Sequence, residues 1–344
     1  MNDSQTADIE NWVRTLPKFD LHVHLDGSMR PDTVNKLACA LRQRKDLPDD
    51  MDIYEAVSPS SRCSLEEYLR AFEITVALLQ DCSALERASY ELCEDAAEEN
   101  VIYMEIRFAP LLHLQDGLKP NQVVEAVLAG MHRAEDKYPI KTGLILCAMK
   151  QEPTQKAIDT AHLAAEYINK GVVGFDLAGP ERGFPPSLHS SAIKEARGAG
   201  LPVTIHAGEG CCPEQIRQAV DLGTDRIGHG VYLYQDPETE AMVREQEITL
   251  EICPTSNLQI SGVIHSYSQH PFKQYLDAGI PVTINTDNRL MSHIDVTHEL
   301  GQMIEAFSLS KNQVKNILLN SANAAFASDK RKQEMRTRVE DAFG

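Results

Sequence analysis

The chain has 344 residues, 42% of them hydrophobic, which is enough for a large folded core. Its formal net charge of −18 argues against nucleic acid or an anionic membrane as a partner. The first residues lack the basic and apolar parts of a signal peptide, no apolar run could cross a bilayer, and the eight cysteines form no Cys-x-x-Cys pair. We therefore expect a reduced, cytoplasmic protein.

Short β-branched or aliphatic runs bounded by Gly, Pro or Asp recur along the chain and predict eight strands. They cover residues 19–25, 102–109, 142–148, 172–178, 203–206, 226–233, 249–253 and 282–286. Helical patterns lie between them, for example at 121–135, 154–169 and 213–222. Eight strands that alternate with helices predict an α/β fold, a (β/α)₈ TIM-type barrel, although an open doubly wound sheet has the same alternation.

Two segments depart from the regular alternation. Residues 26–101 separate the first two strands, and this is about twice what one crossover helix of a βαβ unit needs. We expect a helical insertion at about 30–98 that forms a lid, because barrel enzymes place their sites at the C-terminal rim. The tail, 311–344, is predicted to be amphipathic helix, and the whole chain, 1–344, to be one domain.

The first strand carries His22 and His24, two residues apart. Alternate residues of a strand share a face, so the two imidazoles point the same way and could bind one metal ion together. A half-buried strand that happens to contain two histidines is the plainer interpretation, and the pair alone does not decide between them.

Polar side chains also lie at the ends of other predicted strands. They are His206 and Glu209 after the fifth strand, His229 in the sixth, and Asp287 and Asn288 after the eighth. In a barrel these strand ends converge on one small volume, although the residues are far apart in sequence. This convergence favours a metal-dependent hydrolytic site over separate caps and rim histidines.

The residue types suit one Zn²⁺ per subunit. His22, His24, His206 and Asp287 would provide three nitrogens and one oxygen, with a position left for water. Zn²⁺ can lower the pKa of a bound water to about 7. Glu209 is then the candidate proton donor, His229 would orient the attacking hydroxide, and Asp287 could also accept the proton of the water.

Seven sequence blocks, taken in order, are similar to the adenosine deaminase family, in particular to its bacterial members. They are DLHVHLDGS at 20–28, YMEIRFAP at 103–110, FDLAG at 175–179, HAGE at 206–209, RIGHG at 226–230, EICPTS at 251–256 and NTD at 285–287. The resemblance covers about 16–326. It implies a (β/α)₈ barrel and zinc-dependent conversion of adenosine, and of 2′-deoxyadenosine, to the inosine form with release of ammonia in purine salvage.

The resemblance also implies site residues. It assigns zinc to His22, His24, His206 and Asp287, donation of a proton to purine N1 to Glu209, and a place beside the hydroxide to His229. The Gly179 N–H would meet purine N3, where a glycine lets the backbone approach closely. Residues that would hold the ribose 5′-hydroxyl or cover the nucleoside are His24, Asp26, Leu65, Tyr68, Leu69 and Phe72.

Two positions depart from the family pattern. Asn288 stands where relatives commonly carry a second Asp, which is expected to donate a hydrogen bond to purine N7; an Asn amide donates without being protonated. Pro180 stands where relatives often have Asp, so one N–H and one carboxylate are lost beside the purine. Both departures concern the identity of the substrate and not the type of reaction.

Three alternatives remain open at this point. The substrate could be another aminopurine, such as adenine, an N6-substituted AMP or aminofutalosine, although Arg70 is the one basic residue within 65–72. The chain could be a silent relative that binds without catalysis. It could also hydrolyse esters or phosphates, but such enzymes often bridge two metals through a modified lysine, and none ends the fourth or fifth strand.

Overall fold

The computed structural model describes residues 3–43, 52–58, 62–260 and 262–344. Eight parallel strands follow one another in the order β1 to β8. Their bounds are β1 Lys18–His24, β2 Val101–Phe108, β3 Lys141–Met149, β4 Val172–Ala178, β5 Val203–Ala207, β6 Arg226–His229, β7 Thr249–Ile252 and β8 Val282–Ile284. A parallel bridge between Val23 of β1 and Asp287, three residues beyond the end of β8, closes the sheet into a barrel. The expectation of a (β/α)₈ barrel is confirmed, and the open sheet is excluded.

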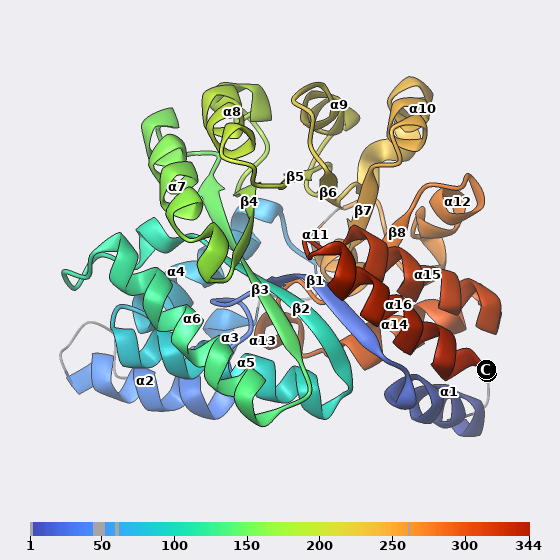
Figure 1. Ribbon diagram of the computed structural model, residues 1–344, viewed down its shortest axis with the longest axis horizontal. Coiled ribbons are helices and arrows are strands. Elements are labelled where there is room, and N and C mark those ends of the chain that lie inside the picture. Colours follow the sequence, from blue (N-terminus) through green and yellow to red (C-terminus); the bar gives the residue numbers. More distant parts are fainter. Residues whose placement is uncertain (1–2, 44–51, 59–61, 261) are drawn as a thin grey trace.

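Helices surround the strands (Figure 1). They are α1 Asp3–Thr15, α2 Pro31–Gln43, α3 Ile53–Val57, α4 Leu65–Leu78, α5 Cys82–Glu98, α6 Pro120–Lys137, α7 Thr154–Glu166, α8 Ser190–Gly198, α9 Pro213–Asp221, α10 Pro237–Glu245, α11 Pro254–Ile260, α12 Phe272–Asp277, α13 Arg289–Ser292, α14 Val296–Phe307, α15 Lys311–Ala324 and α16 Asp329–Phe343. No helix in the described part of the chain is long and apolar enough to span a membrane.

The long segment between β1 and β2 contains α2 to α5. Residues 44–51 and 59–61 of the predicted insertion lie outside the described residues. The helix α4 begins at a capping box: the Ser64 hydroxyl accepts the Glu67 N–H, and the Glu67 carboxylate accepts the Ser64 N–H at 2.9 Å. Leu65, Tyr68 and Phe72 then repeat at helical spacing on one face.

Two predicted elements differ from the structure in a way that single residues explain. The sixth strand stops at His229 instead of 233, because Gly230 takes a left-handed conformation (φ 68°) and a 3₁₀ turn, Val231–Gln235, follows. The C-terminal tail is two helices and not one: Ala325 is extended, and the Ser328 side chain accepts the Arg331 N–H to cap α16.

The interior of the barrel is charged, while its outer wall is apolar. Along β2, Glu105 and Arg107 alternate with Met104, Ile106 and Phe108, and all five residues are fully buried. Because successive strand residues point to opposite faces, the apolar set packs toward the helices and the charged pair points inward. Buried charges need partners, and these partners are what position the site described next.

Candidate active site

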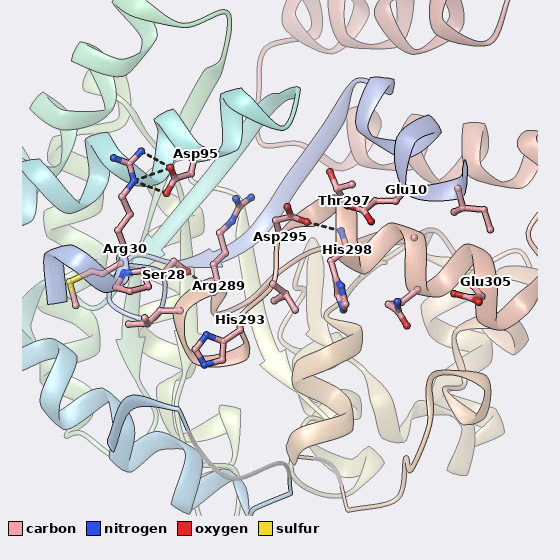
Figure 2. Close-up of a pocket in the computed structure, with 17 residues that line it drawn as sticks. Glu10, Ser28, Arg30, Asp95, Arg289, His293, Asp295, Thr297, His298 and Glu305 are labelled. Carbon is pink, nitrogen blue, oxygen red and sulfur yellow. Dashed lines mark hydrogen bonds and ion pairs between the residues drawn. The ribbon is translucent and has the colours of Figure 1, made fainter. Parts of the chain in front are cut away.

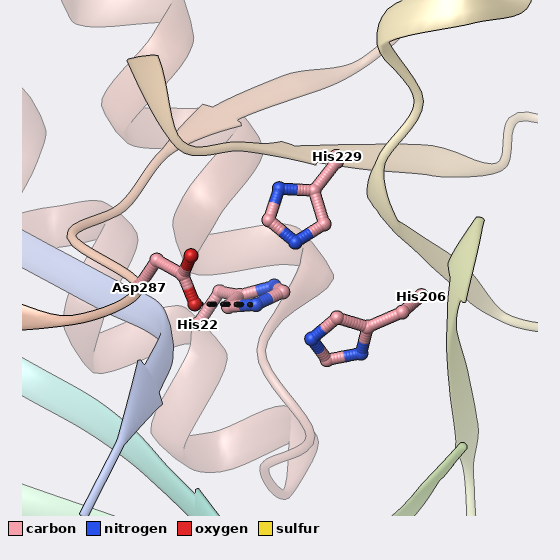
Figure 3. Close-up of side chains that lie close together, drawn as sticks. All are labelled: His22, His206, His229 and Asp287. Carbon is pink, nitrogen blue, oxygen red and sulfur yellow. Dashed lines mark ion pairs between the residues drawn. The ribbon is translucent and has the colours of Figure 1, made fainter. Parts of the chain in front are cut away.

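Four side chains from different strands converge at the carboxyl end of the barrel (Figure 3). His22 comes from β1, His206 from β5, His229 from β6, and Asp287 follows β8. One ligand atom from each lies within 4.8 Å of the others, and all four residues are buried. Such a group of nitrogens and one carboxylate oxygen is a suitable set of metal ligands.

His24 belongs to the same cluster, although the compact group of four contains His229 in its place. The His24 Nε2 lies 3.2 Å from the His206 Nε2 and 3.4 Å from the Asp287 Oδ1. The four predicted metal ligands are therefore brought together, with His229 as a fifth donor beside them. The hydrogen bonds behind the rings of His22, His206 and His229 distinguish the first two, as candidate ligands, from His229.

Two of the imidazoles are backed by carboxylates. His22 Nδ1 lies 2.7 Å from Glu251 Oε2, and His206 Nδ1 lies 3.1 Å from Asp176 Oδ1. A carboxylate accepts a hydrogen bond, so each Nδ1 carries the proton and each Nε2 presents a lone pair to the cluster. His22 Nε2 is buried without a hydrogen-bond partner. This is the state that a metal-binding imidazole requires.

His229 has the opposite arrangement. The Phe272 backbone N–H donates to His270 Nδ1 at 3.0 Å, so the proton of neutral His270 is on Nε2 and goes to Asn257 Oδ1 at 3.1 Å. The Asn257 amide then donates to His229 Nδ1 at 3.0 Å. Burial lowers the pKa of His270 to about 3, and burial together with His22 lowers the pKa of His229 well below its usual value.

Neutral His229 must therefore carry its proton on Nε2, the nitrogen that faces the cluster. An N–H cannot bind a metal ion, but it can donate a hydrogen bond to an oxygen held there. The relay begins at the backbone N–H of Phe272, which can only donate a hydrogen bond and so fixes the direction of the whole chain of bonds. The relay thus makes His229 a hydrogen-bond donor and leaves metal binding to the other imidazoles.

Two backbone hydrogen bonds hold Asp287 in place. Its N–H donates to the His22 carbonyl at 2.8 Å, and its carbonyl accepts the His24 N–H at 2.7 Å. These bonds keep it in the left-handed region (φ 61°), which is strained for a residue with a side chain. Burial opposes its ionisation, yet the adjacent imidazoles, His22 first among them, hold its pKa below the usual range. Ser256 donates to its Oδ2 at 2.6 Å.

Glu209 lies on the other side of His229, with its Oε1 3.5 Å from His229 Nε2. Burial, together with the charges of Asp287 and Glu181, raises the pKa of Glu209 well above its usual value. A raised pKa favours the protonated form of the carboxyl group, which is the form that a general acid needs in order to donate a proton.

A pocket of about 450 Å³ opens onto the cluster, and this volume suits a small organic molecule. All eight residues predicted to contact a substrate line it: His24, Asp26, Leu65, Tyr68, Leu69, Phe72, Gly179 and Asn288. One oxygen of Asp26 and one of Asn288 are buried there without a partner. Gly179 has a φ of 105°, and a Cβ on it would lie 2.5 Å from the Gln151 Oε1.

A second cavity of about 510 Å³ lies beside α14 (Figure 2). Its charged groups already have partners within the protein: Arg30 pairs with Asp95, and Asp295 accepts the His298 N–H. None of the five clustered side chains lines it. The pocket over the cluster is therefore the candidate active site.

Sequence reasoning missed the residues behind the cluster. Arg107 donates to Asp176 at 3.1 Å and to Glu251 at 2.9 Å, so one buried guanidinium holds both carboxylates that orient His22 and His206. A signal was present in the sequence, since charged residues inside strands that are otherwise apolar are rarely buried without a structural purpose. The relay through Asn257 and His270 left no comparable signal.

The fold and the cluster define the class of protein: a (β/α)₈ barrel with a group of side chains at the carboxyl end of its strands that fits a metal ion. The family model described as "Adenosine deaminase" matches residues 17–342. An adenosine deaminase of Enterococcus faecalis is 38% identical over 97% of this chain and 99% of its own length. One of Clostridium kluyveri is 41% identical over 92% and 91%.

Solved structures agree with this assignment. An N6-mAMP deaminase of Arabidopsis superposes with a TM-score of 0.89 at 29% identity, covering 96% of this chain and 99% of that one. A Burkholderia ambifaria amidohydrolase with bound Zn has a TM-score of 0.87 at 25% identity, covering 100% and 93%. The chain belongs to the adenosine deaminase family, and it is an enzyme that hydrolyses a carbon–nitrogen bond.

Proposed function

We propose that this enzyme deaminates adenosine and 2′-deoxyadenosine, as a cytoplasmic enzyme of purine salvage with one Zn²⁺ per subunit. The observation that carries the proposal is that one pocket joins the His/Asp cluster, the Glu209 carboxyl group with its raised pKa, and the apolar face of α4. The curated bacterial relatives that bear the name adenosine deaminase support the choice of substrate.

The residues present fit a zinc ion. His22, His24, His206 and Asp287 would hold it, because the first and third of the histidines turn an Nε2 lone pair inward and Asp287 is ionised. When bound, Zn²⁺ supplies a water whose pKa is lowered to about 7. The hydrogen bond from Ser256 to Asp287 Oδ2 leaves the Asp287 Oδ1 free to face the histidines.

The protein's own groups then handle the protons. Glu209, whose raised pKa favours its protonated form, gives a proton to purine N1, so that charge does not build up in the ring when C6 is attacked. The Nε2–H of His229 donates to the attacking oxygen and orients it toward C6. Asp287 accepts the proton that the water gives up. In the last step the proton taken up by Asp287 goes to the C6 amino group, which leaves as ammonia, while the C6 hydroxyl returns its proton to Glu209 and becomes the carbonyl.

The remaining residues position the nucleoside. The Gly179 N–H would donate to purine N3 and the Asn288 amide to N7, while Asp26 and His24 would hold the 5′-hydroxyl. Leu65, Tyr68, Leu69 and Phe72 would cover the base and ribose, so that α4 acts as the lid. The apolar side chains exclude water from the pocket, which strengthens every polar contact in it.

A second candidate substrate is an N6-substituted AMP, which the likeness to the Arabidopsis N6-mAMP deaminase brings forward. The charges of the pocket argue against it. Its lining holds five acidic side chains, and Arg70, with a side chain 68% exposed, is the one lysine or arginine among the residues that line it. Burial raises the pKa of Asp26 to about 7, so a 5′-phosphate would meet repulsion from Asp26 above that pH and would find no buried lysine or arginine in the lining to pair with. A neutral ribose hydroxyl would not be repelled.

The test is a side-by-side ultraviolet assay with adenosine, 2′-deoxyadenosine, adenine, AMP and N6-methyl-AMP, with ammonia measured in parallel. We expect turnover of the two nucleosides and little of the others. Turnover of N6-methyl-AMP in preference to adenosine would replace the proposed substrate. A stoichiometric content of zinc without any deaminase activity would instead indicate a silent relative.

A further inference from the structure

Two adjacent cysteines lie in the loop between β5 and α9, directly after Glu209 and Gly210. The Cys211 and Cys212 sulfurs are 3.3 Å apart, and both thiols are free. Cys212 is exposed and Cys211 is half-buried. Both line a surface hollow of about 500 Å³, so a small molecule can reach the two sulfurs together from solvent.

A disulfide bond is a poor fit for this pair. Adjacent Cα atoms across a trans peptide are about 3.8 Å apart, whereas disulfide-bonded residues are usually about 4.4–6.8 Å apart. A bond of about 2.05 Å between the sulfurs would therefore strain the loop. A single larger atom placed between the sulfurs could bind both with less movement, because they already lie close to each other on one side of the loop.

We propose that Cys211 and Cys212 form a dithiol site for trivalent arsenicals. An arsenic(III) centre that carries one oxygen, as in phenylarsine oxide, would form two As–S bonds here. The two S–H protons leave with the oxygen as water, and no atom is oxidised or reduced.

The site is connected to the proposed catalytic acid through Glu181. This buried carboxylate accepts three successive backbone N–H groups, from Glu209 at 3.2 Å, Gly210 at 3.0 Å and Cys211 at 2.9 Å. The same loop packs against α4, since a Cβ on Gly210 would lie 2.9 Å from the Leu65 Cβ. An arsenical that bridges the two sulfurs would shift the backbone of this short loop, to which Glu209 belongs.

We therefore expect the adduct to inhibit deamination by displacing Glu209, an effect that rests on the proposed function. Binding itself does not rest on it. The two consequences can be measured separately, binding by mass and inhibition by activity, so that failure of one is distinguishable from failure of the other.

The experiment treats the full chain with one equivalent of phenylarsine oxide and records the mass of the intact protein. Wild type and the control Cys39→Ser, which removes an exposed cysteine elsewhere, should each gain one phenylarsenic group. The adduct should survive excess monothiol and be removed by a dithiol. Cys211→Ser and Cys212→Ser should each lose the monothiol-resistant adduct.

An equally resistant adduct in Cys212→Ser, or its removal by monothiol from wild type, would overturn the site. In the activity measurement, the adduct should abolish most adenosine turnover of wild type and of Cys39→Ser, whereas Cys212→Ser should keep its activity after treatment. Full activity of the wild-type adduct would overturn the connection to Glu209. A protein that binds the arsenical but never deaminates adenosine would refute the proposed function and leave the dithiol site standing.

Discussion

Replacing Asn257 by aspartate would reverse the direction of hydrogen bonding at His229 with almost no change of shape. The Asn257 amide donates to His229 Nδ1 in the native protein, and its oxygen accepts from His270. A carboxylate can only accept, so in Asn257→Asp the proton of His229 moves to Nδ1 and its Nε2 presents a lone pair to the site.

The variant should lose one hydrogen-bond donor, the Nε2–H of His229, to the charge that develops on the attacking oxygen in the transition state. Removal of a single donor of this kind costs about 10²–10³ in kcat. Because His229 does not contact the ribose or the purine edge in the proposed arrangement, KM for adenosine should change little. Both hydrogen bonds of residue 257 persist in the variant, but its carboxylate is buried without a cationic partner, so the thermal stability should fall while the fold and the zinc content are kept.

The assay is steady-state kinetics with adenosine, accompanied by zinc content and thermal unfolding. His270→Gln is the matched control, because a glutamine amide N–H can still donate to Asn257 Oδ1 and keep the relay in its native direction. This control should retain most of the activity. A kcat of Asn257→Asp close to that of wild type, with zinc bound, would refute the argument that the relay sets the tautomer of His229.

Three further predictions concern other parts of the chain. Glu209→Gln should bind zinc and substrate but lose about 10²–10⁴ in turnover, and near-normal turnover would remove Glu209 from the mechanism. Arg107→Met leaves Asp176 and Glu251 buried without their shared cation. It should lower the free energy of unfolding by about 3–5 kcal/mol and make zinc easier to remove with a chelator. An unchanged midpoint of urea unfolding would contradict this. Burial raises the pKa of Glu299 to about 8, so the folded state keeps a proton that the unfolded state loses from about pH 4.5 upward. The free energy of unfolding should therefore fall as pH rises from about 4.5 to about 8. Urea unfolding at pH 5 and pH 8.5 should show a smaller fall for Glu299→Gln than for wild type, and an identical fall in both proteins would exclude this contribution of Glu299.

Most of the fold could be predicted because its pattern is local. Eight buried runs bounded by turn residues indicate eight strands, and the barrel follows from their alternation with helices. The errors occurred where one residue ends an element: Gly230 stops the sixth strand, and Ser328 starts a new helix in the tail. The organisation as one domain and the role of α4 as a lid stay predictions.

The candidate site was predictable to the extent that its residues end strands. His22, His206 and Asp287 converge because parallel strands of a barrel share one rim, a consequence of topology alone. The groups behind them could not be found this way. Which carboxylate meets which imidazole depends on the register of the strands, and the protonated nitrogen of His229 depends on a relay that ends at the backbone of Phe272.

We expect one zinc ion to be bound by His22, His24, His206 and Asp287, and His229 to donate a hydrogen bond without binding the metal. Anomalous X-ray diffraction at the zinc edge, from crystals of the zinc-loaded protein, tests it most directly. We predict one peak within bonding distance of those four side chains. A peak bonded to His229 Nε2, or no peak in this pocket, would contradict the account.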